Sequence, residues 1–226
     1  MKKLLLIAIV ALVGVSASAQ VKFNRTFASK KSNTTWYLRA GMNTNSSGLD
    51  LSEYNGDYYE YNVSSKVGYE VAFGFNKGFG KSNVYWGMEL GVSSRGFSIT
   101  EKEDDDIYGD YSYMGHNVKF VPFMFGYKHP ITEDFKIDGH LGAFASFDFA
   151  STEDYDNGPD DYDIWDESPF DAGIQIGIGA WYKRLNLDFT YQIGFVPSHS
   201  VYYIGSGDED LYAKHSAFLI RLGVAF

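Results

Sequence analysis

Residues 214–226, with the sequence KHSAFLIRLGVAF, decide the fold. Side chains in this stretch alternate between two sets. The large apolar set is Phe218, Ile220, Leu222, Val224 and Phe226, and the set between them is Ala217, Leu219, Arg221, Gly223 and Ala225. Successive side chains of a β-strand point to opposite faces, so the stretch is predicted to be a strand. One apolar face opposite a face of mostly small residues and an arginine is typical of a transmembrane β-barrel strand, with lipid outside and polar filling inside.

The same alternation recurs seven times before this stretch, and it is poorest in the fourth strand, where residues 120–125 are nearly all apolar. It occurs near residues 35–43, 66–76, 84–99, 117–127, 135–149, 174–180 and 185–195. Three short turns (77–82, 129–134 and 183–184) alternate with four long polar connections (44–62, between 99 and 117, 151–168 and 196–213). An even strand number with alternating short and long connections predicts an all-β fold, an eight-stranded antiparallel up-and-down transmembrane β-barrel. Pro122 lies inside the fourth strand, where proline requires a bulge or a special position.

A soluble eight-stranded barrel of the lipocalin type is the alternative. Its apolar face would point inward around a ligand, and its solvated outer face would carry charges. Here the second face is rich in glycine and small residues instead, as in the sixth strand, where Gly173, Gln175, Gly177 and Gly179 oppose the isoleucines. Small residues suit a narrow lumen, which favours the membrane barrel.

The amino terminus has the order of a signal peptide. Two lysines after Met1 precede the apolar run 4–15, and Ala17-Ser18-Ala19 forms a small-residue cleavage site. A transmembrane helix needs roughly 20 apolar residues, more than this run provides. We therefore expect a signal peptide at 1–19, a short periplasmic lead-in at 20–34, a barrel domain at 35–226, and location in the bacterial outer membrane. The chain has no cysteine, which excludes disulfides and lipid attachment through cysteine.

The charge of the chain is strongly negative. Loss of residues 1–19 removes Lys2 and Lys3, so the formal charge of −10 becomes −12. No basic footprint for nucleic acid is present, and outer-membrane lipid is the expected surrounding partner. The long connections carry many acidic and tyrosine residues, a composition that fits either a partner-binding surface or an outer aromatic girdle.

Two stretches are similar to a known family. Residues 89–97 (ELGVSSRGF) and 118–128 (VKFVPFMFGYK) resemble the third and fourth strands of the outer-membrane protein β-barrel domain family, in its PorT-like group of Bacteroidota. The resemblance implies an eight-stranded barrel and accounts for Pro122. Lys119 stands where the family usually has an acidic residue. The resemblance implies no activity.

The predicted inward face carries charges of both signs. In a narrow lumen these must be paired to offset desolvation, so a structural ion-pair plug is favoured over the alternative of a narrow pore. The predicted polar network of the lumen comprises Arg39, Glu70, Glu89, Arg95, Lys136, Asp138, His140, Asp188 and Arg221.

Catalytic and metal motifs are weak. A lipid-modifying enzyme needs a serine activated by a base, for which Ser198-His199-Ser200 and His215-Ser216 are the candidates. His215 and Ser216 would point to opposite faces of a strand. The acidic stretch 154–161 lacks the glycine and glutamate positions of a calcium loop. We therefore predict no enzyme activity, no catalytic residue, no cofactor and no metal. The leading hypothesis is a structural or protein-interaction component that meets another envelope protein, and the alternatives are a small pore or, less favoured, a lipid-modifying outer-membrane enzyme.

Overall fold

The computed structural model describes residues 34–48, 59–80, 82–103, 106–156, 162–166, 168–197, 199–203 and 211–226. The predicted signal peptide and all but the last residue of the predicted lead-in lie outside these residues. Among the residues described, no helix is long and apolar enough to cross a membrane.

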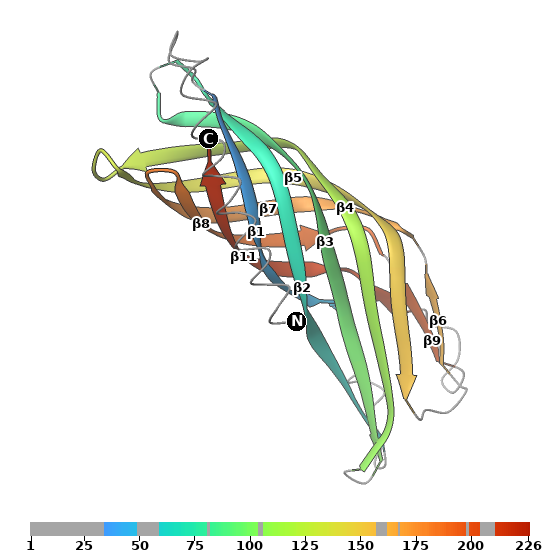
Figure 1. The fold of residues 1–226 in the computed structure, drawn as a ribbon. Helices are drawn as coiled ribbons and strands as arrows, with labels where there is room; N and C mark the ends of the chain where they lie inside the picture. The colour runs from blue at the N-terminus through green and yellow to red at the C-terminus, as the bar shows by residue number, and fades with distance from the viewer. Residues whose placement is uncertain are drawn as a thin grey trace.

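Eight antiparallel strands close into a barrel (Figure 1). They are β1 (Thr34–Ser46), β2 (Tyr59–Gly78), β3 (Val84–Glu103), β4 (Asp106–Pro130), β5 (Phe135–Asp156), β7 (Phe170–Tyr182), β8 (Leu185–Gly194) and β11 (Ser216–Ala225). The ring order is β1-β11-β8-β7-β5-β4-β3-β2, and β1 closes the ring because it pairs with both β2 and β11. The predicted eight-stranded barrel is confirmed.

The strand β11 shows how alternation builds the two faces of the wall. Phe218, Ile220 and Leu222 are exposed on the outer surface, and Leu219 and Arg221 are completely buried inside. The other barrel strands repeat this arrangement, so the outer surface is a band of exposed apolar and aromatic side chains, and charged and amide side chains line the buried inner face. Such an inversion of the usual soluble pattern is expected of a barrel surrounded by lipid.

Pro122 lies at a β-bulge, as its sequence position requires. The pairing of β4 with β5 shifts register between Phe120 and Phe123, and the pairing of β3 with β4 shifts between Gly87 and Glu89. Proline cannot donate to the ladder, so the interruption costs little there. The bulge also explains the poor alternation of this strand, because Val121 and Met124 both point inward although they are three residues apart.

Three short turns and the two strand ends of the barrel lie at one end. Phe79 N donates to Val84 O at 3.0 Å in the first turn, and Ile131 N donates to Phe135 O at 2.9 Å in the second. The third turn is residues 183–184, between β7 and β8. Phe226 N donates to Trp36 O at 3.0 Å, which fixes the end of the last strand beside the beginning of the first. This is the periplasmic end in bacterial barrels.

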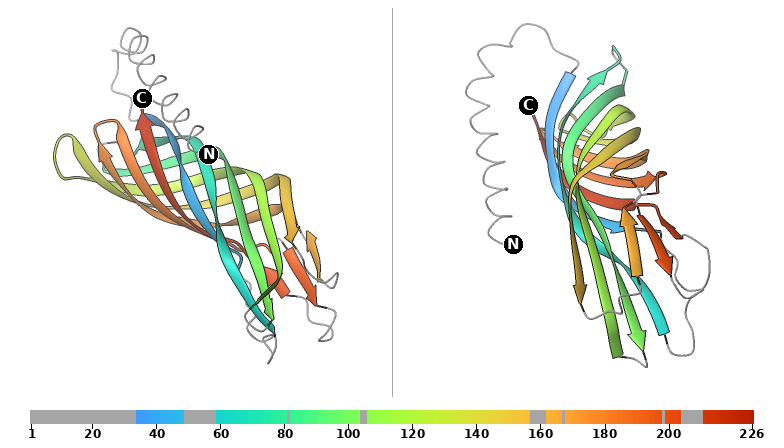
Figure 2. Two further views of the ribbon diagram at one scale, coloured as in Figure 1. Left: turned by 60° about the horizontal axis from the view of Figure 1, so that its bottom comes forward. Right: turned by 90° about the vertical axis from the view of Figure 1, so that its right-hand side faces the viewer.

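The opposite end contains more regular structure than the sequence predicts. The strands β3 and β4 continue to Glu103 and from Asp106, so the predicted acidic loop between 99 and 117 is largely a hairpin. The predicted loops 151–168 and 196–213 contain the end of β5 and a three-stranded sheet of β6 (Tyr162–Asp166), β9 (His199–Tyr203) and β10 (Leu211–Ala213). Figure 2 shows this small sheet at the same end as the extensions of β2 to β5. An inward aromatic cluster in the extensions explains why the strand pairing continues. The ring centroid of Phe97 lies 5.8 Å from that of Tyr113 and 6.1 Å from that of Tyr111.

Candidate functional site: the charged lumen

Arg221 of β11 lies at the centre of the lumen and contacts three carboxylates. Its Nε and Nη2 donate to Oδ1 of Asp188 at 2.9 and 2.6 Å. Its Nη1 donates to Glu70 Oε1 at 2.6 Å and to Glu89 Oε2 at 3.2 Å. All four side chains are at most 1% exposed. The guanidinium fork suits this arrangement, because its donors point in several fixed directions at once.

Arg39 of β1 contacts two of the same acids, Glu89 and Asp188. Its Nη1 donates to Glu89 Oε1 at 2.7 Å and lies 3.4 Å from Asp188 Oδ2. Its Nε donates to Asn186 Oδ1 at 2.8 Å. The guanidinium also stacks 4.4 Å from the ring centroid of Tyr37, whose hydroxyl donates to Glu89 at 2.9 Å. Arg39 is therefore fixed by both charge and packing.

Lys119 of β4 completes the central cluster through an ion pair with Glu70. The three cations and three anions of this cluster balance. They are Arg39, Lys119, Arg221, Glu70, Glu89 and Asp188. Charges this deeply buried are tolerated only when paired and hydrogen-bonded, and each carboxylate here contacts at least one cation.

His140 lies beside this cluster, with its Nε2 3.7 Å from Asp188 Oδ2. Its Nε2 is 3.2 Å from Thr190 Oγ1 and its Nδ1 is 3.5 Å from Asp138 Oδ2. Asp138 accepts from Tyr85 Oη at 2.6 Å and from Trp181 Nε1 at 2.9 Å. The Tyr85 and Trp181 rings belong to a buried cluster at this side of the lumen. Its members are Tyr37, Tyr85, Val121, Met124, Phe144, Trp181 and Ala225.

The order Asp138–His140–Thr190 resembles an acid–base–nucleophile triad. Thr190, however, is completely buried, and its hydroxyl already donates to Asp188 at 2.9 Å and accepts from Arg221 at 3.2 Å. A nucleophile must have its attacking oxygen free to reach a substrate. The arrangement is therefore suited to orienting His140 rather than to attack.

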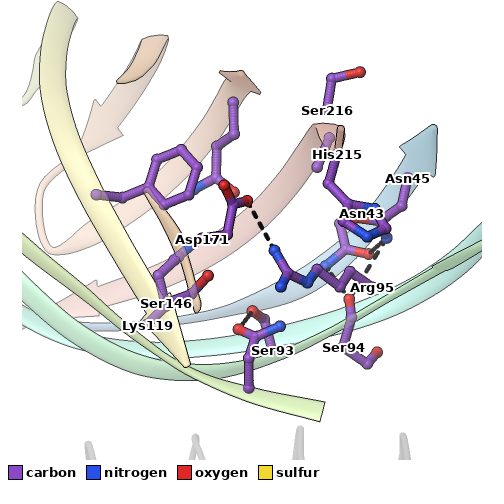
Figure 3. A pocket seen from close by; sticks show the side chains of 14 residues that line it. Asn43, Asn45, Ser93, Ser94, Arg95, Lys119, Ser146, Asp171, His215 and Ser216 are labelled. Carbon is purple, nitrogen blue, oxygen red and sulfur yellow. Dashed lines mark hydrogen bonds and ion pairs between the residues drawn. The ribbon is translucent and has the colours of Figure 1, made fainter. Parts of the chain in front are cut away.

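A second ion-pair cluster lies nearer the long-loop end, and Figure 3 shows Arg95 and Asp171 of this cluster pointing toward each other. Arg95 of β3 donates to Asp171 Oδ2 of β7 and to Asp148 Oδ2 of β5, both at 2.8 Å. Ser93 Oγ donates to Asn117 Oδ1 at 2.6 Å close by. Ser93, Arg95, Asn117 and Asp171 border a cavity with a volume of about 20 Å³, which is enough for about one water molecule.

The nine predicted lumen residues separate into three groups. Seven of them meet in or beside the central cluster: Arg39, Glu70, Glu89, Asp138, His140, Asp188 and Arg221. Arg95 belongs to the outer cluster. Lys136 is exposed, so its predicted place in the buried network is wrong: alternation points it inward, but it is the second residue of β5 and lies beyond the enclosed part of the lumen.

The sequence-based network lacked several members that the structure supplies. Lys119, Asp148, Asp171, Asn186 and Thr190 all bind its charged groups. The alternation of inward and outward side chains along each strand could have identified most of them as inward-facing, because they alternate with outward apolar residues.

The catalytic and calcium motifs of the sequence fall mostly outside the described side chains. This holds for Ser198-His199-Ser200 and for most of 154–161. His215, just before β11, is buried, and Ser216, the first residue of β11, is partly exposed. In the part of the chain that the structure describes, no group of three or more His, Cys, Asp or Glu side chains is arranged to hold a metal ion.

Comparisons with solved structures find other outer-membrane barrels. OprG of Pseudomonas aeruginosa is 15% identical, with 86% of this chain and 97% of that chain covered and a TM-score of 0.48. Ail of Yersinia pestis, solved with the heparin analogue sucrose octasulfate, is 13% identical, with 85% of this chain and 99% of that chain covered and a TM-score of 0.36. The protease OmpT of Escherichia coli is 9% identical, with 85% of this chain and 95% of that chain covered and a TM-score of 0.43. No curated protein sequence matches the chain.

The family comparison covers most of the chain. Residues 18–200 match the family model described as outer membrane protein beta-barrel domain. The match agrees with the closed eight-stranded ring, the apolar outer surface and the charged interior. The chain therefore belongs to the outer membrane protein β-barrel domain family and is a protein of the bacterial outer membrane.

Proposed function

We propose that this barrel is a non-enzymatic structural or protein-interaction component of the cell envelope, with its lumen closed by a plug of paired charges. The observation that carries the proposal is the position of Arg221, completely buried and bound to carboxylates from β2, β3 and β8. One side chain thereby links four strands across the lumen.

The burial and pairing of the central charges favour a plug over a conducting pore. A conducting path needs hydrated groups that can exchange partners with passing ions. The six central charges are instead at most 3% exposed and are paired with one another. Eight strands also enclose an interior just wide enough for side chains to fill.

An interaction role is supported by the long-loop end. The strands β2 to β5 continue beyond their barrel neighbours: β1 pairs with β2 only as far as Lys66, and β7 pairs with β5 only as far as Phe147. Together with the small sheet, these extensions present ordered backbone outside the apolar band. Recognition surfaces built on regular elements are well suited to a protein partner.

We further propose membership of the PorT-like group. Its support is the pair of stretches 89–97 and 118–128, which the structure places next to each other as paired segments of β3 and β4. We also propose that residues 1–19 are a cleaved signal peptide and that Gln20 begins the mature chain.

Co-purification from native outer membranes in mild detergent, followed by mass spectrometry, tests the interaction role. We expect one stoichiometric envelope partner, and sequencing of the purified barrel should begin at Gln20. Recovery of the barrel alone would overturn the interaction role. Steady single-channel conductance of the purified barrel in planar bilayers would overturn the plug, and an altered lipid composition in a deletion strain would overturn the non-enzymatic assignment.

A further inference from the structure

The strand β5 has an open edge at the long-loop end. Its pairing with β7 stops at Phe147, and the next backbone contact on that side is the 2.7 Å hydrogen bond from Asp148 N to Pro169 O. On its other side β5 stays paired with β4 as far as Asp156. Among the described residues, the backbone of 149–156 is therefore paired with a strand on one side only. The right-hand view of Figure 2 shows this end of β5 as an outer edge of the extension.

The side chains along this edge are exposed on both faces of the strand. Residues 149–154 are all exposed, and Phe149 is 57% exposed. The small sheet does not pair with the edge, because in the part of the chain that the structure describes β6 pairs with β9 alone. An unpaired row of backbone N–H and C=O groups is a template on which a further strand can form.

The charge of this edge indicates which kind of strand would fit. Residues 149–156 of β5 and 106–116 of the adjacent β4 contain no lysine or arginine. Their acids are Asp106, Asp110, Glu153, Asp154 and Asp156. Like charges that face each other in a sheet are destabilising. Two copies of this chain joined at the edge would bring three acids each into one short ladder, whereas a basic strand would bring charges of the opposite sign.

We propose that the open edge of β5 binds an extended segment of a protein partner that is rich in lysine or arginine and that adds to the sheet as a further strand. The inference rests on the proposed interaction role and names the kind of segment that this end of the barrel would bind. Backbone hydrogen bonds would supply affinity, and contacts of basic side chains with Glu153 and Asp154 would supply specificity.

The test is the binding of a synthetic peptide to the intact barrel in lipid nanodiscs. The probe is a short peptide of alternating lysine and valine, and a glutamate–valine peptide of equal length is its counterpart. Amide hydrogen exchange locates the binding, because an added strand protects backbone N–H groups and electrostatic attraction alone does not. The edge variant is E153K/D154K. The matched control, E133K/D134K, reverses two adjacent exposed acids in the β4–β5 turn at the opposite end.

We expect the wild-type barrel to bind the lysine peptide roughly tenfold or more tightly than the glutamate peptide, because complementary charge sets specificity. Exchange should slow within residues 149–154. The edge variant should lose both effects, and the control should retain them. Equal binding of the two peptides, unchanged exchange at 149–154, or an equal loss in both variants overturns the proposal.

Co-purification with the same variants separates this inference from the proposed function. If wild type and E153K/D154K recover the same envelope partner in equal amounts, the interaction role stands and the β5 edge is not its site. If neither recovers a partner while the lysine peptide still protects residues 149–154 of the wild type, the interaction role fails and the edge remains a binding site for basic strands.

Discussion

Arg221 and Asp188 face each other in register across β11 and β8, and both side chains are completely buried. Two nitrogens of the guanidinium donate to the same carboxylate oxygen, at 2.6 and 2.9 Å. Because β11 also pairs with β1, which closes the ring, this contact ties the last strand to the interior of the barrel. The pair is therefore part of barrel closure as well as of the plug.

Arg221→Met should destabilise the barrel strongly. The substitution preserves much of the volume but leaves Asp188, Glu70 and Glu89 with one cation fewer, and breaking a buried ion pair costs about 3–5 kcal/mol. Urea unfolding in lipid vesicles, followed by tryptophan fluorescence, measures the loss. Lys214→Met, at an exposed position, should change the stability by less than about 0.5 kcal/mol. Equal stability of the two variants would contradict the central role of Arg221.

Lys119→Met should cost less than Arg221→Met, by the same measurement. Lys119 contacts one acid of the cluster, Glu70, and that acid keeps its 2.6 Å hydrogen bond to Arg221 when Lys119 is lost. We expect a destabilisation of about 1–3 kcal/mol, the cost of one buried group left partly unsatisfied. A larger effect than that of Arg221→Met would show that Lys119, rather than Arg221, holds Glu70 in place.

The lining of the lumen could be predicted from the sequence only where side chains alternate regularly between the two faces of a strand. This alternation correctly placed Arg39, Glu89 and Arg221 inside. It gave Lys136 the right direction but not its depth along the strand, because alternation does not show where the enclosed interior begins. Which acid meets which base depends on the tilt and stagger of eight strands, so the contact between Arg221 and Glu70, 151 residues apart, is invisible in the sequence.

The extended strands at the long-loop end were missed for a different reason. Residues 100–103 and 106–116 carry no continuous lipid-facing apolar set, so the sequence alone predicts a polar loop there. Their strand structure depends on cross-strand pairing, for example of Phe97 with Tyr113, which is a tertiary contact.

Gly177→Ala should destabilise the barrel through His140. A Cβ at this position would lie 2.6 Å from the His140 ring carbon Cε1 and 2.7 Å from Thr190 Oγ1, closer than side-chain contacts normally come. We expect a loss of about 1–3 kcal/mol, the usual cost of overpacking. The comparison variant is Gly139→Ala, because the nearest atom to a Cβ there is 4.0 Å away.

A double-mutant cycle identifies His140 as the cause. If the new methyl group collides with the imidazole, Gly177→Ala should cost clearly less in the background of His140→Ala than in the wild type. Additive losses would contradict this explanation and would assign the strain to Thr190 or to the backbone instead.

The central cluster, rather than the outer one, should close the lumen. The outer cluster consists of Arg95 with Asp148 and Asp171, and it borders the small cavity, whereas the central charges lie deeper and span the barrel. R95A/D148A/D171A removes one cation and two anions near the long-loop end without touching the central six. In planar bilayers we expect this variant to show no steady conductance, like the wild type. Resolved current steps in the variant alone would place the closure at Arg95 and leave the central cluster a role in stability only.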